Sequence, residues 1–471
     1  MLFNSLSFVV FLAIVLVLYY TKILSWKNKK GMLLLASYLF YGLWNPPLII
    51  LLWISTMVDW TAGNKLAKEK NKQYRKLWLL LSMFVNLGFL AFFKYGNFLI
   101  ENFTAFVNAF DIYYHPQKMD IILPMGISFY TFQTMSYTID LYNKKIKPAK
   151  TFLDFALYVT FFPQLVAGPI VRAKELITQF YKPKKATFNQ FIWGLFLLTL
   201  GLFQKVVLAD TLLSSTSDAV FDSGKILNFW DAWSGTLAFS GQIFFDFAGY
   251  STCAIGIALM LGIILPDNFK YPYASIGFSD LWKRWHISLS SWLRDYLYIP
   301  LGGNRFGITR MYAALMITML LGGLWHGAAW TFVFWGMLHG LYLVAERLQK
   351  RYLPFEINGL NGFFLAFLTF TCVNFTWVFF RAQQFSTAKN MLLSMLYFHP
   401  EGEKILSYFD ILKVMTVVTI MFLCHWFMRN TTVKEVSARI NSLHLGIIWA
   451  VMFLLIAIAQ GSGEQFIYFQ F

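Results

Sequence analysis

The chain has 471 residues, of which 58% are hydrophobic and 13% are charged, and its formal net charge is +16. The charged fraction is roughly half of the ~25% that is usual in soluble domains, so the composition excludes an ordinary water-facing globule. The positive charge lies in separate islands between apolar stretches. A nucleic-acid-binding protein needs one continuous basic face, and we therefore expect no nucleic-acid partner.

Apolar stretches of about 15 or more residues recur, and each with its flanks can cross a ~30 Å hydrocarbon layer as a helix. The first, Leu2 to Tyr20, is followed rather than preceded by lysines. This order predicts a membrane anchor with its N-terminus outside the cytoplasm, not a cleaved signal peptide. The later stretches are Met32 to Ile54 with an interruption, Leu77 to Phe93, Ile192 to Leu208, Tyr312 to Tyr342, Leu360 to Phe380 and Leu445 to Ala459.

The stretch after Gly31 is predicted to form two helices, because the proline pair in Trp44-Asn45-Pro46-Pro47 cannot continue a helix. Short basic connections are expected in the cytoplasm, since an excess of Lys and Arg in short loops sets the orientation. They are Lys65 to Lys76 with five lysines and one arginine, Asn143 to Lys150 with four lysines, and Lys182 to Lys185 with three. No linker or repeat divides the chain, so residues 1–471 are predicted to be a single polytopic membrane domain.

Between Phe278 and Arg310 charged residues alternate with tryptophan and tyrosine. This alternation of charged and aromatic residues is typical of the membrane–water interface, where amphipathic rings and long cationic side chains are stable. The simplest interpretation is a helix lying flat on the bilayer, which does not exclude a catalytic role.

His326 is the histidine that the sequence marks most strongly, because it stands inside an apolar stretch, in Gly322-Gly-Leu-Trp-His-Gly-Ala-Ala-Trp330. Ionisable groups at membrane depth are costly and usually functional. The small residues around it permit close approach by another helix, a substrate or a tunnel. A packing histidine is the alternative. His339 follows 13 residues later and is expected to point to a different face of one straight helix.

The chain contains no nucleotide-binding loop, metal-ligand cluster or nucleophile elbow. Its three cysteines are far apart and offer neither a metal site nor a disulfide framework. We therefore expect no metal and no permanently bound cofactor. A histidine that accepts a proton from a hydroxyl or thiol is then the best candidate for a catalytic group, because its pKa lies near working pH.

Seven segments run in order from near the N-terminus to about two-thirds of the way along the chain. They are Asp59-Trp-Thr-Ala-Gly63, Leu123-Pro-Met-Gly-Ile-Ser-Phe-Tyr-Thr-Phe132, Phe162-Pro-Gln-Leu-Val-Ala-Gly-Pro-Ile170, Gly201-Leu-Phe-Gln-Lys-Val-Val-Leu-Ala-Asp210, Phe245-Asp-Phe-Ala-Gly-Tyr250, Trp282-Lys-Arg-Trp-His286 through Gly302-Gly-Asn-Arg305, and Gly323-Leu-Trp-His-Gly327. Together they closely resemble the membrane-bound O-acyltransferase superfamily, and within it the bacterial alginate O-acetyltransferase type. The resemblance implies an all-α bundle of about ten or more transmembrane helices around a tunnel, with interfacial and re-entrant helices.

The resemblance also implies a function. An O-acyltransferase of this type would lie in the bacterial cytoplasmic (inner) membrane, among its lipids. It would take acetyl groups from cytoplasmic acetyl-CoA and act with an extracytoplasmic acetyltransferase partner to O-acetylate an alginate-like surface polysaccharide. His326 stands at the position of the family's catalytic histidine and is expected to be the general base, and His286 matches a second motif histidine. The sequence departs from the usual Gly-Tyr-Ser-Asp-Met at Thr252, which argues against an acidic role there, although Asp246 remains.

The donor's phosphates need cationic partners, and bidentate arginine suits them. We expect some of five cations to bind the donor on the cytoplasmic side, with lipid-headgroup anchoring as the alternative for each. They are Lys283, Arg284, Arg294, Arg305 and Arg310.

Several other functions stay open. D-alanyl transfer to teichoic acid uses proteins that share both histidine motifs, but the run from Arg294 to Arg305 favours the alginate type. Peptidoglycan or cellulose could replace alginate as the acceptor. A polytopic transporter or flippase would also be rich in apolar helices, although such proteins often contain related halves and no internal repeat is visible here. A structural anchor for a polymer-export complex would need neither His326 nor the charged aromatic segment.

Overall fold

The computed structural model describes residues 1–353, 358–459 and 466. This part of the chain consists of helices and connecting segments and forms no β-strand, apart from an isolated bridge between Leu227 and Glu403. The predicted all-α class is confirmed. Two compact units are present, with unit 1 comprising Met1–Leu195 and Ala254–Pro266 and unit 2 comprising Phe196–Cys253 and Asp267–Phe471.

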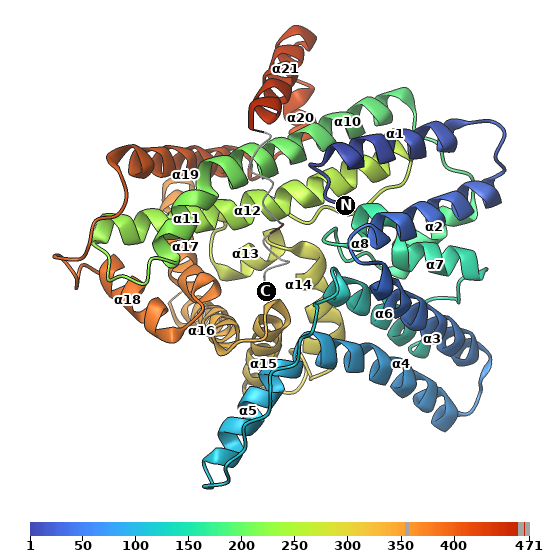
Figure 1. Cartoon of the computed structure of the whole chain (residues 1–471), viewed down its shortest axis with the longest axis horizontal. Helices are drawn as coiled ribbons and strands as arrows, with labels where there is room; N and C mark the ends of the chain where they lie inside the picture. Colours follow the sequence, from blue (N-terminus) through green and yellow to red (C-terminus); the bar gives the residue numbers. More distant parts are fainter. Residues whose placement is uncertain (354–357, 460–465, 467–471) are drawn as a thin grey trace. The chain divides into compact units, whose positions relative to one another are not determined.

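Unit 1 contains the N-terminal helices, in which α3, α4 and α6 pack against one another and α2 packs on α7. Figure 1 shows these helices in blue to blue-green. Their bounds are α1 (Leu6–Tyr20), α2 (Trp26–Gly42), η1 (Pro46–Leu48), α3 (Ile49–Lys68), α4 (Lys72–Phe93), α5 (Gly96–Asn108), α6 (Ile127–Tyr142), α7 (Phe152–Thr160), α8 (Phe162–Leu165), α9 (Ala173–Leu176) and η2 (Ile177–Tyr181).

Two long helices, α10 (Phe188–Leu202) and α12 (Phe229–Met260), contain the boundaries between the units. Unit 2 has an aromatic-rich core to which α12, α16, α17 and α19 contribute. Its other elements are η3 (Phe203–Ser214, a π-helix), α11 (Ser215–Phe221), η4 (Pro272–Ala274), α13 (Phe278–Arg284), α14 (Ile287–Leu293), η5 (Arg294–Tyr298, also π), α15 (Ile308–His326), α16 (Trp330–Tyr352), α17 (Gly359–Arg381), α18 (Phe385–Met395), α19 (Tyr408–Met428), α20 (Val433–Ser437) and α21 (Ser442–Ala459).

Eight helical runs in the described part of the chain are long and apolar enough to cross a membrane. Only 17% of the apolar window of α4 and 11% of that of α21 are buried by protein, so most of their surface is available to lipid. The chain is therefore a multi-pass membrane protein. The eight runs are Pro46–Lys68, Lys72–Phe93, Phe188–Phe221, Phe229–Met260, Ile308–His326, Gly359–Arg381, Tyr408–Met428 and Ser442–Ala459, and the apolar α1 is shorter.

The helix break predicted at the proline pair is confirmed. Helix α2 ends at Gly42, a single 3₁₀ turn spans Pro46–Leu48, and α3 begins at Ile49. The α1–α2 and α3–α4 connections, which are rich in lysine, lie at the same edge of unit 1 (Figure 1). This arrangement is the one that the charge pattern requires, while the side that faces the cytoplasm stays a prediction.

A buried carboxylate joins three helices of unit 1. Asp59 on α3 accepts hydrogen bonds from Ser82 Oγ (2.5 Å) and Asn86 Nδ2 (2.9 Å), both on α4. The Asn86 Oδ1 atom accepts in turn from Ser55 Oγ (2.8 Å) and from Thr134 Oγ1 (3.1 Å) on α6. Because hydrocarbon offers no alternative partners, these bonds fix how α3, α4 and α6 pack.

A buried ion pair plays the corresponding role in unit 2. The Lys205 Nζ atom lies 2.7 Å from Asp210 Oδ1 and 2.6 Å from Asp246 Oδ1, and all three side chains are nearly inaccessible. Lys205 and Asp210 are five residues apart, a spacing that the π-helical geometry of η3 brings to one face. The Lys205–Asp246 contact thereby holds η3 against α12.

We expect Lys205→Met to lower the free energy of unfolding by about 3–5 kcal/mol, because it removes the cation between two buried carboxylates. The matched control is Lys225→Met, which breaks an exposed pair with Glu403 and should change stability by ~0–1 kcal/mol. Thermal unfolding of purified protein in detergent compares the two. Equal shifts would contradict a structural role for the buried pair.

Candidate active site

His326 is the last residue of α15, and the helix stops there. Gly327 is extended and α16 begins at Trp330, so His326 and His339 lie on two separate helices. The expectation that both stand on one straight helix was wrong. The apolar stretch from Tyr312 to Tyr342 is a pair of packed helices with a short connection.

Glycines make this pair of helices possible. A Cβ atom at Gly327 would lie 2.1 Å from the ring of Phe332. At Gly323 and Gly336 a Cβ would lie 2.2 Å from a backbone oxygen of the facing helix. The prediction that small residues around His326 allow close approach of another helix is confirmed, and that helix is α16.

Aromatic rings surround the buried His326 side chain. The ring centroids of Trp325, Trp335 and Phe380 lie 5.0, 5.1 and 5.2 Å from the imidazole centroid, and each ring meets it edge to face. Such walls exclude water and lower the local dielectric.

The flat helix expected between Phe278 and Arg310 is not what the structure contains. This segment is divided into α13, α14 and η5, and Trp285, His286 and Trp292 are buried. The division falls at His286, whose backbone is left-handed with φ of 41°. A non-glycine residue in this conformation is strained and ends the preceding helix.

Asn268 holds this strained turn. Its backbone oxygen accepts from Ile287 N (2.9 Å), and its Oδ1 accepts from Ser288 N (3.2 Å) and Ser288 Oγ (2.9 Å). Its Nδ2 donates to Ser251 Oγ (3.2 Å), next to the Thr252 departure from the family pattern. The segment after α12 is thereby joined to the start of α14.

The same Asn268 oxygen determines which nitrogen of His286 carries the proton. Asn268 Oδ1 lies 3.2 Å from His286 Nδ1 and is already an acceptor for the Ser288 backbone N–H. Nδ1 must therefore donate, which leaves the lone pair on Nε2. Burial lowers the pKa of His286 to about 3, so the ring is neutral at working pH.

A tryptophan lies between the two motif histidines. The Trp325 ring centroid is 5.8 Å from that of His286 and 5.0 Å from that of His326. Phe247 on α12 meets His286 edge to face at 4.7 Å. Because Phe247 follows Asp246, the buried ion pair also positions a wall of this site. The structure therefore brings the two predicted histidines into one aromatic cluster.

His339 belongs to the edge of the same cluster. Its centroid is 4.5 Å from that of Trp335, which also contacts His326. The Thr376 hydroxyl donates to Val373 O, so its oxygen accepts from His339 Nε2 at 3.0 Å. His339 is thus a packing histidine held by a hydrogen bond that joins α16 to α17.

The five predicted cations fall into two groups. Arg284 pairs with Asp280 at 2.9 Å and donates to the backbone oxygen of Arg429, and Arg310 donates to Leu301 O. These two guanidinium groups already serve the local fold. Lys283, Arg294 and Arg305 are exposed, and Arg294 contacts only its neighbour Asp295 among the ion pairs of the described chain.

Sequence reasoning missed Asn268 and Lys205. Asn268 follows Leu265-Pro266-Asp267, so it reads as an ordinary turn residue. Lys205 and Asp246 both lie within segments that carried the family resemblance, but 41 positions separate them and nothing local indicates their pairing. Among the residues that the structure describes, no group of three or more His, Cys, Asp or Glu side chains could hold a metal ion.

Sequence comparison with known proteins tests the family resemblance separately. A sequence model of the membrane-bound O-acyltransferase family matches residues 149–356, a range that includes both motif histidines. The chain is 41% identical over 404 residues to the probable alginate O-acetylase AlgI of Pseudomonas putida, covering 84% of this chain and 81% of that protein. It is 38% identical over 396 residues to the peptidoglycan O-acetyltransferase of Helicobacter pylori, covering 78% and 73%. It is 25% identical over 290 residues to the teichoic acid D-alanyltransferase of Bacillus subtilis, covering 58% and 72%.

Proposed function

Since this chain belongs to the membrane-bound O-acyltransferase family and is a multi-pass membrane acyltransferase, we propose that it moves acetyl groups from cytoplasmic acetyl-CoA across the membrane for O-acetylation of an alginate-like surface polysaccharide. The membrane would be the bacterial inner membrane, and an extracytoplasmic acetyltransferase would complete the reaction. Membership of an acyltransferase family argues against the transporter and export-anchor alternatives.

The observation that carries this proposal is the aromatic enclosure of His326 at a helix break. His326 takes the proton of the acceptor hydroxyl as its oxygen attacks the thioester carbonyl. The new C–O bond forms, the C–S bond breaks, and the proton passes from the imidazolium to the departing thiolate. His286 orients the acceptor from its place in the same aromatic cluster.

A second polymer is a candidate for the acetyl acceptor. Identity to the peptidoglycan O-acetyltransferase is close to that for the alginate proteins, so peptidoglycan is the main alternative. D-alanyl transfer is disfavoured by lower identity over a smaller share of the chain. Labelled acetyl-CoA supplied to the cytoplasmic face of vesicles, with the extracytoplasmic acetyltransferase partner and each polymer at the opposite face, tests both. Consumption of the thioester without acetylation of either polymer would overturn the polysaccharide proposal.

We expect His326→Gln to reduce acetyl transfer per inserted molecule by ~10²–10⁴, because glutamine fills the site but cannot act as a base. The matched control is His339→Gln, which can still donate to Thr376 and should retain most of the activity. Acetylation and membrane abundance are measured together. A His326→Gln protein that inserts normally and works at the parental rate would remove the base assignment.

Asn268→Leu is expected to lower kcat by up to about 100-fold, because it frees the His286 ring to shift and to change tautomer. The KM for acetyl-CoA should stay unchanged. Asn268→Asp keeps an acceptor for His286 Nδ1 and Ser288 and should recover part of the rate. If both variants lose activity only in proportion to their membrane abundance, Asn268 has a folding role alone.

The combined substitution Arg294→Gln and Arg305→Gln should raise the KM for acetyl-CoA about 10-fold, because charge-assisted bonds to phosphate are lost. The comparison is Lys225→Gln on an exposed loop, which should leave that KM unchanged. Titration of donor on vesicles at fixed ionic strength gives both values. An unchanged KM in the double variant would assign these arginines to lipid headgroups.

A further inference from the structure

Helix α5 has two opposite faces. Its apolar stripe consists of Leu99, Phe103 and Phe106, together with Phe110, which lies just beyond the end of the helix. Each of these side chains is more than half exposed. The polar residues Asn97, Glu101, Thr104 and Asn108 recur every three or four positions and lie about half a turn away. A soluble helix would bury the first face and expose the second.

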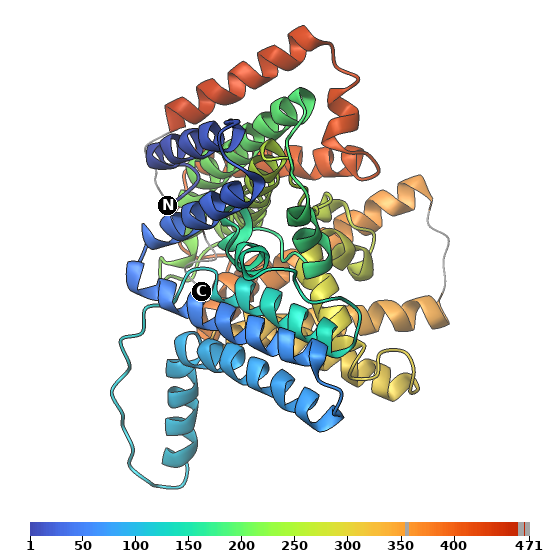
Figure 2. The same ribbon diagram turned by 90° about the vertical axis from the view of Figure 1, so that its right-hand side faces the viewer.

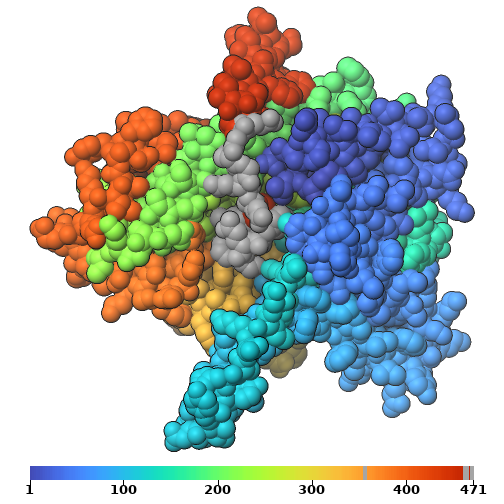
Figure 3. Space-filling model, in the orientation of Figure 1, coloured from blue at the N-terminus to red at the C-terminus, as the bar shows by residue number. Residues whose placement is uncertain are grey.

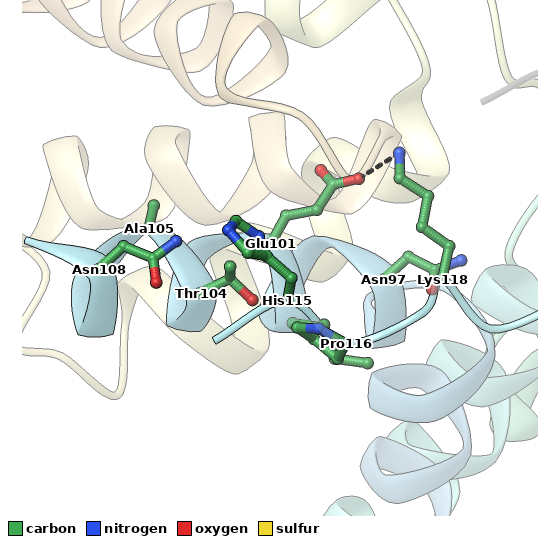
Figure 4. A pocket seen from close by; sticks show the side chains of 9 residues that line it. Asn97, Glu101, Thr104, Ala105, Asn108, His115, Pro116 and Lys118 are labelled. Atoms are coloured by element: carbon green, nitrogen blue, oxygen red, sulfur yellow. Dashed lines mark ion pairs between the residues drawn. The ribbon is translucent and has the colours of Figure 1, made fainter. Parts of the chain in front are cut away.

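The chain covers the polar face with its own return segment, residues 112–119. Asn97 exchanges two hydrogen bonds with the backbone of Met119 (3.0 and 2.9 Å), and Glu101 pairs with Lys118 at 2.7 Å. Asn108 Oδ1 accepts from Tyr114 N at 3.1 Å. Figure 4 shows these polar side chains around a hollow of about 320 Å³ between the helix and the return segment.

The exposed face continues a surface that meets lipid. Helix α4 crosses the membrane and leaves large apolar side chains exposed along its length, including Leu77, Phe84 and Phe92. Only two residues separate α4 from α5, and α5 runs across the direction of α4 in both ribbon views (Figure 2). A helix that runs across a membrane span lies along the membrane plane. In Figure 3, α5 and its return segment stand out from unit 1 as an arm.

We propose that this arm, residues 96–119, lies in the headgroup layer of the bilayer with its phenylalanine face in the hydrocarbon. The apolar stripe carries no charge, so it suits acyl chains, while the Glu101–Lys118 pair on the polar side faces water. Tyr113 and Tyr114 follow the end of α5, where Tyr114 N donates to Asn108, and amphipathic rings of this kind favour the interface. On the predicted topology the arm occupies the extracytoplasmic leaflet, and it fixes the depth at which α4 ends and the segment leading to α6 begins.

Fluorescent labelling of single cysteines in the full chain tests the proposal. The background carries Cys253→Ala, Cys372→Ala and Cys424→Ala, and the protein is placed in phosphatidylcholine nanodiscs, whose two faces are both accessible. The apolar-face positions are Leu99→Cys and Phe106→Cys. The matched controls on the return side are Gln117→Cys and Asp120→Cys, both at exposed residues.

We expect an environment-sensitive label at 99 and 106 to be quenched at least several-fold more by nitroxide-bearing lipid than by iodide. The label at 117 and 120 should show the opposite order. If the label at 99 and 106 is quenched by iodide as strongly as the controls, the lipid proposal is overturned. Protection of those positions only after an extracytoplasmic protein is added would overturn it as well, and would assign the face to that protein.

Discussion

Hydrocarbon supplies no hydrogen bonds, and this constraint determines where the polar side chains of the chain lie. Asp59 reaches Ser82 and Asn86 in unit 1, and Lys205 reaches Asp210 and Asp246 in unit 2. The first contact joins the consecutive helices α3 and α4, and the Lys205–Asp246 contact joins η3 to α12. A polar group leaves water at low cost only when it is paired. Apolar packing then fills the space that these contacts have defined, as the aromatic core of unit 2 does.

The same constraint applies to the backbone. An interrupted helix within a membrane protein is stable only where protein surrounds the break. The connection after His326 meets this condition, because Gly327 lies directly against Phe332. The left-handed turn at His286 meets it through three bonds to Asn268 from the next two residues. Both histidines therefore stand where a helix is broken, and strain held by neighbours at such positions is a common feature of sites that bind or react.

Much of the fold was predictable from local pattern. The proline pair after Trp44 marked a helix break, and apolar runs located most of the spans, because both signals act within a few residues. The sequence also singled out His326 and His286. It did not indicate that a helix ends at His326, since Gly-Ala-Ala also occurs within membrane helices. The partners of Lys205 and His286 depend on tertiary contacts over many residues, and no periodicity in the sequence encodes such contacts.

Aromatic content alone was a poor guide to exposure. The segment from Phe278 to Arg310 resembled an interface, yet Trp285 packs against Trp377 in the core of unit 2. Sequence reasoning did not single out α5, yet its Phe103 and Phe106 are exposed. The two segments differ in where their polar residues form hydrogen bonds. In α5 they recur with the helical period and bond to the return segment, so the apolar stripe on the opposite face stays more than half exposed. Around His286 the polar residues bond to other segments of unit 2, and the aromatic rings beside them are buried. Whether an aromatic segment faces lipid or core therefore depends on where its polar face finds hydrogen bonds.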